Sequence, residues 1–290
     1  MEVKALTETL IWCFRDELVT AERSKATIEK YLRDLDVFFA WLPAEKTVCK
    51  ETVIAYKDHL RAHYATSSVN SMLAAVNRFL RTVHWDDCTV RSLKTQRRVF
   101  CAQDTELTKE EYLRLLEAAS SSGQQRLYFI MQTICSTGIR VSELEYITVE
   151  ALHHGRAEVN CKNKLRTIFL PLDLCHMLLN YAAEQSLKKG PVFVTRSGKP
   201  VNRSNVWADM QKLCTVAQVA QTKVFPHNLR HLFATTYYSI EKDIIRLADI
   251  LGHSSIDTTR IYTISTGEEH RRQIAGLGLL YCKMRQKNTT

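Results

Sequence analysis

Apolar residues recur at helical spacing in the first third of the chain. Between Ile28 and Leu42 they fall on one side of a helix, which we expect Thr27 to cap and Pro43 to end. Three more helices are expected here, around Leu10–Leu18, around Val53–Leu60, and from Ser67 or Ser68 through Val83. Four helices in about 90 residues predict a small bundle that folds independently.

The pattern changes beyond residue 107. A capping box from Thr108 to Glu111 precedes an apolar helix, and the next helix is expected to end at Gly138 in the left-handed conformation. Two β-rich runs, Arg156–Cys161 and Arg166–Leu170, predict a hairpin. Val192–Thr195 is a candidate third strand, and more helices are predicted at Cys175–Ala183, Ser204–Val216, Asn228–Ile240, Asp243–Leu251 and from Glu268.

The expected fold class is therefore mainly α. A small hairpin or three-stranded sheet belongs to the second domain. The chain divides into a helical domain at residues 1–94, a basic linker at 95–107 and a second domain at 108–290.

Positive charge is concentrated outside the first helical bundle. The formal net charge is +9, but residues 1–94 contain 14 Lys and Arg against 13 Asp and Glu, so nearly all of the surplus lies beyond them. Such a balance favours polyanionic partners, nucleic acid or an anionic membrane surface. Around the start of the linker, Lys94, Arg97 and Arg98 are either phosphate contacts or a solvated charge run.

The cysteines argue against a zinc centre or a disulfide framework. Nine are present and none forms a C-x-x-C pair, so reduced thiols and no metal are expected. No stretch approaches the ~20 apolar residues of a membrane span. Charged residues such as Arg15 and Asp16 interrupt the region where a signal peptide would lie. We therefore expect a cytoplasmic protein with no membrane anchor.

Arginine and histidine side chains suited to phosphate binding stand near predicted helix ends. Arg140 follows Gly138, where its planar fork can grip an anion with two hydrogen bonds. Glu143 either orients Arg140 or stabilises the start of the next helix. Pro226 suits the first position of a helix, so His227 and Arg230 are expected one turn apart on one face of it.

His231 follows His227 at the spacing of two zinc ligands on one helix. Asn228 stands where an H-E-x-x-H motif has its glutamate, so a metal is not expected, and His231 fits a packing or hydrogen-bonding role. His253 follows a helix end, and Tyr262 lies nine residues further on. A tyrosine is protonated at neutral pH, so Tyr262 needs help from its neighbours to act as a nucleophile.

Together these segments resemble the tyrosine recombinase (phage integrase) family. The matching motifs are T-G-I-R-V-S-E-L at Arg140, H-N-L-R-H from His227, L-G-H-S-S at His253 and T-T-R-I-Y-T at Tyr262. The likeness covers the whole second domain, and the first domain resembles the family's SAM-like core-binding domain, which binds DNA. Within the family the chain looks most like integrases of bacterial conjugative transposons and other mobile elements. Its length is also that of the Xer recombinases.

The resemblance implies a site-specific recombinase that needs neither ATP, metal nor another cofactor. Tyr262 would attack a scissile phosphodiester, form a 3′-phosphotyrosyl bond and release a 5′-hydroxyl. Arg140 and Arg230 would hold the phosphate, His227 would accept the tyrosine proton or bind the phosphate, and His253 would donate a hydrogen bond to it.

In the family, a hairpin lysine protonates the leaving oxygen. Two lysines qualify here, Lys162 and Lys164. Lys162 is preferred because the hairpin looks one residue shorter than the common family form, and Lys164 would then contact DNA.

The partners implied are double-stranded DNA at specific recombination sites, gripped by both domains, and three further copies of the chain. The segment from Ile264 either packs on its own domain or docks on a neighbour, which would couple the subunits of a dimer of dimers by exchange of the C-terminal helix. Alternatives are Xer-like resolution of replicon dimers, a type IB topoisomerase and an inactive DNA-binding regulator. The motifs at His253 and Tyr262 argue against the topoisomerase, and the complete residue set argues against the regulator.

Overall fold

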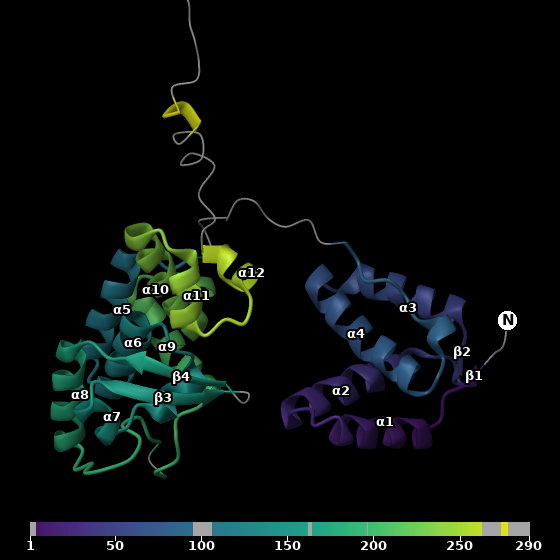
Figure 1. The fold of residues 1–290 in the computed structure, drawn as a ribbon, viewed down its shortest axis with the longest axis horizontal. Helices are drawn as coiled ribbons and strands as arrows, with labels where there is room; N and C mark the ends of the chain where they lie inside the picture. The colour runs from purple at the N-terminus through teal and green to yellow at the C-terminus, as the bar shows by residue number, and fades with distance from the viewer. Residues whose placement is uncertain (1–3, 95–105, 162–163, 196, 263–273, 278–290) are drawn as a thin grey trace, which may run out of the picture. The chain divides into compact units, whose positions relative to one another are not determined.

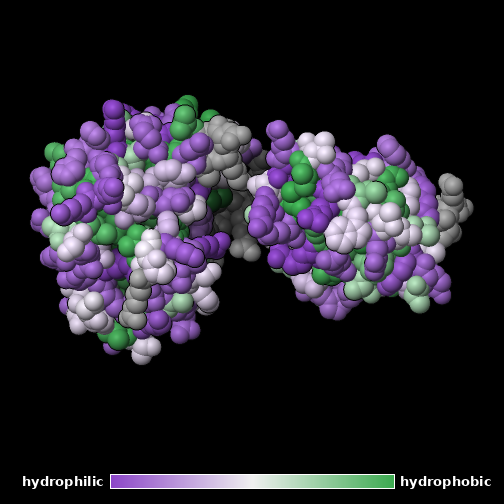
Figure 2. All heavy atoms as spheres, turned by 90° about the horizontal axis from the view of Figure 1, so that it is seen from below, coloured by the Kyte–Doolittle hydropathy of each residue, from purple (hydrophilic) through white to green (hydrophobic). Residues whose placement is uncertain are grey.

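A computed structural model describes residues 4–94, 106–161, 164–195, 197–262 and 274–277. The chain forms two compact units, residues 1–97 and residues 98–290 (Figure 1). Hydrophilic side chains cover most of the face of each unit seen in Figure 2. None of the helices in the described ranges is both long enough and apolar enough to span a membrane.

The first unit is a helical bundle with a short antiparallel strand pair, β1 with β2. Its elements are β1 (Lys4–Ala5), α1 (Glu8–Thr20), α2 (Lys25–Trp41), β2 (Thr47–Val48), α3 (Lys50–His63), α4 (Thr66–Thr82) and the 3-10 turn η1 (Asp86–Cys88). The four predicted helices are confirmed. Two predicted starts are wrong: Ser24 caps α2 by accepting the N–H of Thr27, and α4 begins at Thr66 after Ala65.

Helices α2 and α4 pack together at the centre of this unit. Their inward side chains, among them Phe38 and Phe79, are fully buried. Phe79 also meets Phe14 of α1 edge to face, with ring centroids 5.6 Å apart. Burying one such ring contributes roughly 1.5–3 kcal/mol, which explains why the spacing of apolar residues predicts these helices well.

Two asparagines of α4 hold the segment that leaves the first unit. The Nδ2 of Asn77 donates to the carbonyl of Val90 at 2.8 Å, and its Oδ1 accepts the Val90 N–H at 2.9 Å. Asn70 makes the same pair of bonds to Leu93, at 3.0 and 2.7 Å. Each side-chain carboxamide therefore makes the two hydrogen bonds that a neighbouring β-strand would make, and it fixes the backbone just before the linker.

The second unit is mostly helical around one hairpin. Its first elements are α5 (Lys109–Ser121), α6 (Gln125–Thr137), the 3-10 helix η3 (Val141–Tyr146), α7 (Val149–His153), β3 (Arg156–Cys161) and β4 (Lys164–Phe169). The remaining elements are α8 (Leu172–Glu184), α9 (Arg203–Ala217), η4 (Gln221–Lys223), α10 (Pro226–Glu241), α11 (Ile244–Leu251), α12 (Ile256–Thr259) and η5 (Arg260–Tyr262).

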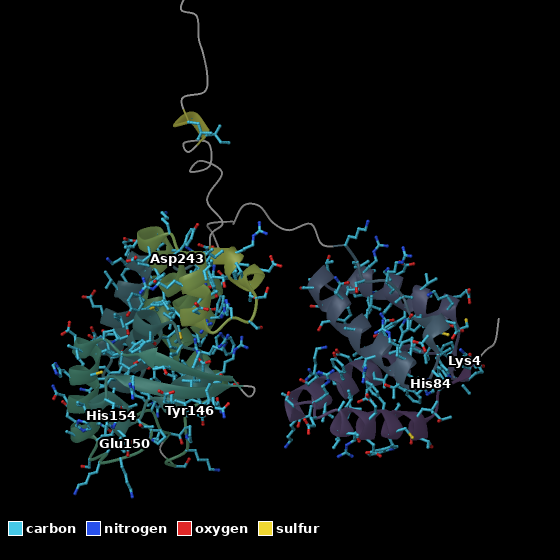
Figure 3. The ribbon with its side chains drawn as sticks, viewed as in Figure 1. Lys4, His84, Tyr146, Glu150, His154 and Asp243 are labelled. Carbon is cyan, nitrogen blue, oxygen red and sulfur yellow. The ribbon has the colours of Figure 1, made fainter. Side chains whose placement is uncertain are left out.

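Local signals in this unit are largely confirmed. Thr108 and Glu111 form the predicted capping box, and Gly138 ends α6 with φ +66°. Asp243 caps α11 by accepting the N–H groups of Ile245 and Arg246 (Figure 3). Most of the helix predicted from Glu268 lies outside the described residues.

The sheet of the second unit has two strands among the described residues, not three. β3 and β4 pair antiparallel, with Cys161 opposite Lys164. The run Val192–Thr195 forms no strand: Val194 makes one isolated bridge to Pro200, and Pro191, just before the run, makes another to Thr148. Its residues Val192 and Phe193 are buried, so the apolar run reflects core packing, not strand pairing.

Three helix ends meet where α6, α10 and α11 pack (Figure 1). Gly138 permits this approach, because a Cβ atom there would lie 2.4 Å from the ring of Phe233 in α10. Ala234, Leu247, Leu251 and Tyr262 form a small buried cluster beside the same junction. The fold thereby brings residues 138–143, 227–231 and 250–262 into one neighbourhood.

Candidate active site

Three of the predicted phosphate-binding residues line one pocket. Arg140 enters it from the start of η3, and His227 and Arg230 enter it from the first two turns of α10. The pocket has a volume of about 220 Å³, and its walls are completed by Ile139, Val141, Ser142, Arg203 and Pro226. Pro226 is the first residue of α10, as predicted.

Arg230 is the buried centre of this arrangement, with 2% of its surface exposed. Its guanidinium donates to the carbonyl of Gly138 at 2.5 Å and to that of Leu251 at 2.7 Å. These carbonyls are at the C-terminal ends of α6 and α11, where helix dipoles favour a cation. Burial, and then the charge of Arg140, lowers the pKa of Arg230 to about 10, so it remains charged at neutral pH.

Glu143 is 1% exposed and holds two guanidinium groups. Its Oε1 lies 2.9 Å from Nη1 of Arg140, and its Oε2 lies 2.5 Å from Nη2 of Arg166. Oε2 also accepts the backbone N–H of Arg140 at 2.8 Å. Burial would raise the pKa of Glu143, but the N–H of Arg140 and the two guanidiniums outweigh it, so the pKa is lowered. Glu143 therefore both orients Arg140 and caps η3.

His253 links Arg230 to the segment that carries the tyrosine. Its Nε2 lies 3.0 Å from Nη2 of Arg230, and its Nδ1 lies 2.8 Å from Oγ1 of Thr259. Burial is the main cause that lowers the pKa of His253 to about 4, followed by the charges of Arg230 and Arg140. The imidazole is therefore neutral at pH 7.

Tyr262 is packed against two histidines and is only 4% exposed. Its ring lies edge to face with His231, with centroids 4.9 Å apart, and nearly parallel to His253, with centroids 6.1 Å apart. A negative charge on Tyr262 would raise the pKa of Arg230, so the two side chains lie within electrostatic reach of each other. The four other described residues of the predicted catalytic set therefore gather around Arg230.

The remaining two histidines differ in their surroundings. His227 reaches solvent in the pocket, yet partial burial and then the charge of Arg230 lower its pKa. His231 lies 3.6 Å from the Glu106 carboxylate. Burial lowers the pKa of His231, although Glu106 acts in the opposite direction. His231 thus has the packing and polar contacts expected for it.

Four predicted residues cannot be placed by their side chains. Lys162, Arg97 and Arg98 lie outside the described residues, and of Lys164 only the backbone is described, as the first residue of β4. Lys94 is exposed at the end of the first unit. The described ranges contain no group of three His, Cys, Asp or Glu side chains able to hold a metal.

The sequence analysis missed Arg166, Thr259 and Arg203. Arg166 is the second partner of Glu143, Thr259 holds Nδ1 of His253, and Arg203 lines the pocket with His227. A cation facing Glu143 could have been suspected only once Glu143 was known to be buried, because an exposed glutamate needs no partner.

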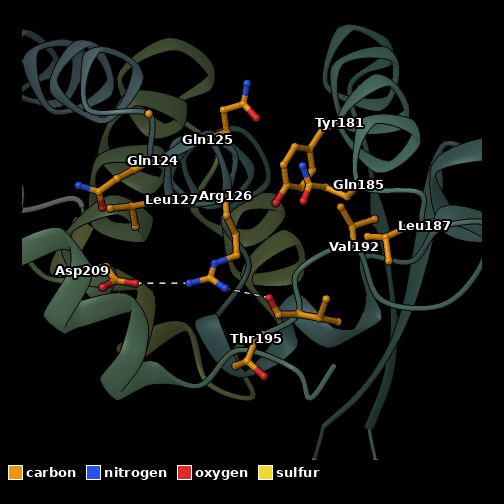
Figure 4. Close-up of a pocket in the computed structure, with 12 residues that line it drawn as sticks. Gln124, Gln125, Arg126, Leu127, Tyr181, Gln185, Leu187, Val192, Thr195 and Asp209 are labelled. Carbon is orange, nitrogen blue, oxygen red and sulfur yellow. Dashed lines mark hydrogen bonds and ion pairs between the residues drawn. The ribbon is translucent and has the colours of Figure 1, made fainter. Parts of the chain in front are cut away.

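A second pocket, of about 520 Å³, lies at the opposite end of α6 (Figure 4). There Arg126 donates to the carbonyl of Val194 at 3.0 Å and lies 3.6 Å from the carboxylate of Asp209. Because a helix of 13 residues is about 20 Å long, this pocket is separate from the cluster around Arg230. None of the predicted site residues lines it.

Comparison with known proteins shows the family to which the chain belongs. The sequence profile of the phage integrase family matches residues 105–269, more than half of the chain. The chain belongs to the phage integrase family. A second profile, of the phage integrase N-terminal SAM-like domain, matches residues 13–86 of this integrase-family protein. The family consists of tyrosine recombinases, so the chain is an enzyme of site-specific DNA recombination.

Similar proteins include tyrosine recombinase XerD of Halalkalibacterium halodurans, 30% identical over 83% of this chain and 87% of the relative. Tyrosine recombinase XerA of Pyrococcus furiosus is 26% identical over 97% of this chain and 98% of the relative. The crystal structure of a lambda integrase (75–356) dimer bound to a COC′ core site has a TM-score of 0.72 at 16% identity, covering 97% and 99% of the two chains. That likeness shows the mainly helical recombinase fold, as predicted.

Proposed function

We propose that this protein cleaves and rejoins DNA at specific sites through a 3′-phosphotyrosyl bond at Tyr262, and thereby integrates and excises a mobile element. The observation that carries the proposal is the gathering of Arg140, His227 and His253 around Arg230, with Tyr262 packed beside them. Such a set is suited to holding one phosphate next to one phenol.

The two arginines supply fixed positive charge for the phosphorus transition state. Attack at phosphorus builds negative charge on the non-bridging oxygens, which preorganised donors stabilise strongly in a buried site. Arg230 is held by two carbonyls, and Arg140 is held on one side by Glu143. Removing one such donor typically slows the chemical step by about 100-fold to 1,000-fold.

The proton transfers follow from the same residues. The Oη of Tyr262 bonds to phosphorus and its proton passes to His227, which is neutral at pH 7, with a ring nitrogen free to accept, because burial and the charge of Arg230 lower its pKa. The bond to the 5′-oxygen breaks, and that oxygen takes a proton from Lys162, or from Lys164 in the alternative assignment. The freed 5′-hydroxyl of a partner strand then reverses the step, so no hydrolysis and no ATP are needed.

The proposed partner is double-stranded DNA bound by a homotetramer, a dimer of dimers. A structure of the same fold is a lambda integrase tetramer bound to a Holliday junction. We assign contacts with the DNA backbone to Lys94, Arg97 and Arg98. The segment from Ile264 is proposed to dock on a neighbouring subunit, although most of it lies outside the described residues. Work on chromosomal DNA implies a cytoplasmic, nucleoid-associated protein.

A suicide substrate, which traps the covalent intermediate, tests the nucleophile. The wild type and Tyr237→Phe, a control in the same apolar cluster, should form a covalent protein–DNA adduct. Tyr262→Phe should form none while still binding DNA. An adduct with Tyr262→Phe would refute this nucleophile, and the absence of any adduct with the wild type would favour the inactive regulator.

The general acid can be identified with a substrate whose leaving group does not need to be protonated. A substrate with a 5′-phosphorothiolate leaving group needs no protonation, so it should restore cleavage by Lys162→Ala. Lys164→Ala should show no such rescue. Rescue confined to Lys164→Ala would transfer the role to Lys164.

Xer-like resolution of replicon dimers is the second candidate, because relatives along most of the chain are named Xer recombinases. A plasmid with two directly repeated sites should be resolved in that case. Two separate marked duplexes should be joined if integration is the function. A type IB topoisomerase would relax supercoils without exchanging strands between duplexes.

A further inference from the structure

The side chain of Arg166 contacts two separate segments of the site. Arg166 belongs to β4 and is paired with Val159 of β3. Its Nη2 lies 2.5 Å from Oε2 of Glu143, and its Nη1 donates to the carbonyl of Ile250 at 2.5 Å. The guanidinium therefore joins the hairpin to η3 on one side and to the last turn of α11 on the other.

The turn after α11 rests directly on the Arg166 side chain. Gly252 ends α11 with φ +63°, and a Cβ atom there would lie 2.7 Å from Cδ of Arg166 and 2.9 Å from its Nε. The next residue is His253, whose N–H is bonded to the carbonyl of Ala248 at 2.9 Å. The position of Arg166 thus sets where this turn presents the imidazole.

We propose that Arg166 is a positioning residue for DNA cleavage, one that orients Arg140 through Glu143 and His253 through the turn at Gly252. The inference rests on the proposed function, since it concerns the same phosphate site. Arg166 does not line the phosphate pocket and its side chain is 14% exposed. It acts through the residues that it holds, not by touching the phosphate.

Charge balance explains why this second cation is needed. Glu143 is almost fully buried and accepts from both arginines. Without Arg166, its Oε2 would lose a charged partner inside the protein, which is costly. Glu143 could most simply replace the lost partner by forming a bidentate salt bridge with Arg140. That salt bridge would turn the Arg140 guanidinium away from the pocket. Arg166 keeps Glu143 satisfied and leaves donors of Arg140 free for a phosphate.

Arg166→Met tests the proposal, because it keeps the aliphatic stem and removes the fork. Arg156→Met is the matched control, since Arg156 is an exposed arginine of the same hairpin. Arg166→Lys adds a graded variant, because an ammonium cannot reach two acceptors as a planar fork does. Gly252→Ala displaces the Arg166 side chain without changing it, so it reports on the same contact if Arg166→Met does not fold.

Single-turnover cleavage of a suicide substrate, DNA affinity and thermal melting are measured on the full chain. Arg166→Met should cleave about 100-fold more slowly than Arg156→Met, as expected for a misplaced catalytic group. Arg166→Lys should be intermediate, and both should bind DNA within about threefold of Arg156→Met. A neutral methylphosphonate at the scissile position should remove most of the cleavage defect, because its transition state carries less negative charge and needs less positive charge from the protein. A cleavage defect caused by a general loss of structure would persist with this substrate.

Two results would overturn the inference. One is cleavage by Arg166→Met and Gly252→Ala at the rate of Arg156→Met. The other is a double variant, Arg166→Met with Glu143→Gln, whose loss in cleavage rate equals the product of the two single losses. Residues that act through one chain of contacts should not have independent effects. The proposed function is tested separately by Tyr262→Phe, so a failure of Arg166 alone leaves it standing.

Discussion

Nη2 of Arg230 lies 3.0 Å from Nε2 of His253. A guanidinium can only donate, so Nε2 must accept, and the ring proton of the neutral imidazole is on Nδ1, facing Oγ1 of Thr259. In this state His253 has no proton to offer a phosphate at Nε2. Donation to the phosphate therefore requires that Arg230 release Nε2 and that Nε2 gain a proton, either by protonation of His253 or by a change of tautomer in which Thr259 donates to Nδ1.

We predict that DNA raises the pKa of His253. In the free protein its NMR titration should have its midpoint near pH 4, because burial and the nearby arginines lower the pKa to about 4. Binding of Tyr262→Phe to a DNA site brings a phosphate anion close and should shift the midpoint upward. His253→Gln identifies the signal, and a free-protein midpoint near the ordinary value of about 6.5 would contradict the geometry.

The same shift has a consequence for stability. The unfolded chain binds a proton at His253 below about pH 6.5, whereas the folded chain binds it only near pH 4. This residue therefore makes the protein less stable as the pH falls from about 6.5 towards 4. Urea unfolding across that window should show a smaller loss for His253→Gln than for the wild type.

Replacing Glu143 should destabilise the second unit strongly. Glu143→Gln leaves two guanidiniums without their buried carboxylate, and we expect a loss of about 3 kcal/mol in unfolding free energy at pH 7. Glu145→Gln, an exposed neighbour in η3, should cost little. Because the folded pKa of Glu143 is lowered, its contribution is present above the usual glutamate value and disappears as the pH falls through the folded value. Equal stability of the two variants at pH 7 would show that the cluster is not coupled in this way.

Alanine substitutions at two glycines with the same φ angle can distinguish the cost of backbone strain from the cost of overpacking. Gly123 and Gly138 both have φ +66°, but a Cβ atom meets nothing within 4 Å at Gly123 and lies 2.4 Å from Phe233 at Gly138. Gly123→Ala should cost about 1 kcal/mol from backbone strain alone. Gly138→Ala should cost about 3 kcal/mol, since overpacking is added. It should also slow cleavage, because the Gly138 carbonyl holds Arg230. Similar losses from both substitutions would mean that Phe233 moves aside freely.

The exit of the first unit should depend on Asn77. Asn77→Ala leaves the N–H and carbonyl of Val90 without partners in a buried place, for an expected loss of about 2 kcal/mol in urea unfolding. Asn70→Ala removes an equivalent pair from Leu93 at a half-buried site. It should therefore cost less. The reverse order would show that burial does not decide the strength of these anchors.

Local sequence signals determined most of the helices and several of their ends. The capping box at Thr108, the left-handed end at Gly138 and the proline start of α10 depend only on neighbouring residues, which is why the sequence sufficed to predict them. The motifs at His227 and Tyr262 pointed to phosphate chemistry through their resemblance to a known family, which the sequence shows without a fold. The prediction of a third strand was wrong because a buried apolar run has the same composition whether or not it pairs with a neighbouring strand.

Only the tertiary structure decided how the candidate catalytic residues are held. Glu143 and Arg166 are 23 residues apart, and Arg230 reaches the carbonyl of Gly138 across 92. No periodic pattern in the sequence predicts contacts between residues so far apart along the chain. These contacts form only when helix ends pack together and exclude water. Burial then makes partners obligatory, so the support of the site follows from packing, whereas its reactive groups could be read along the chain.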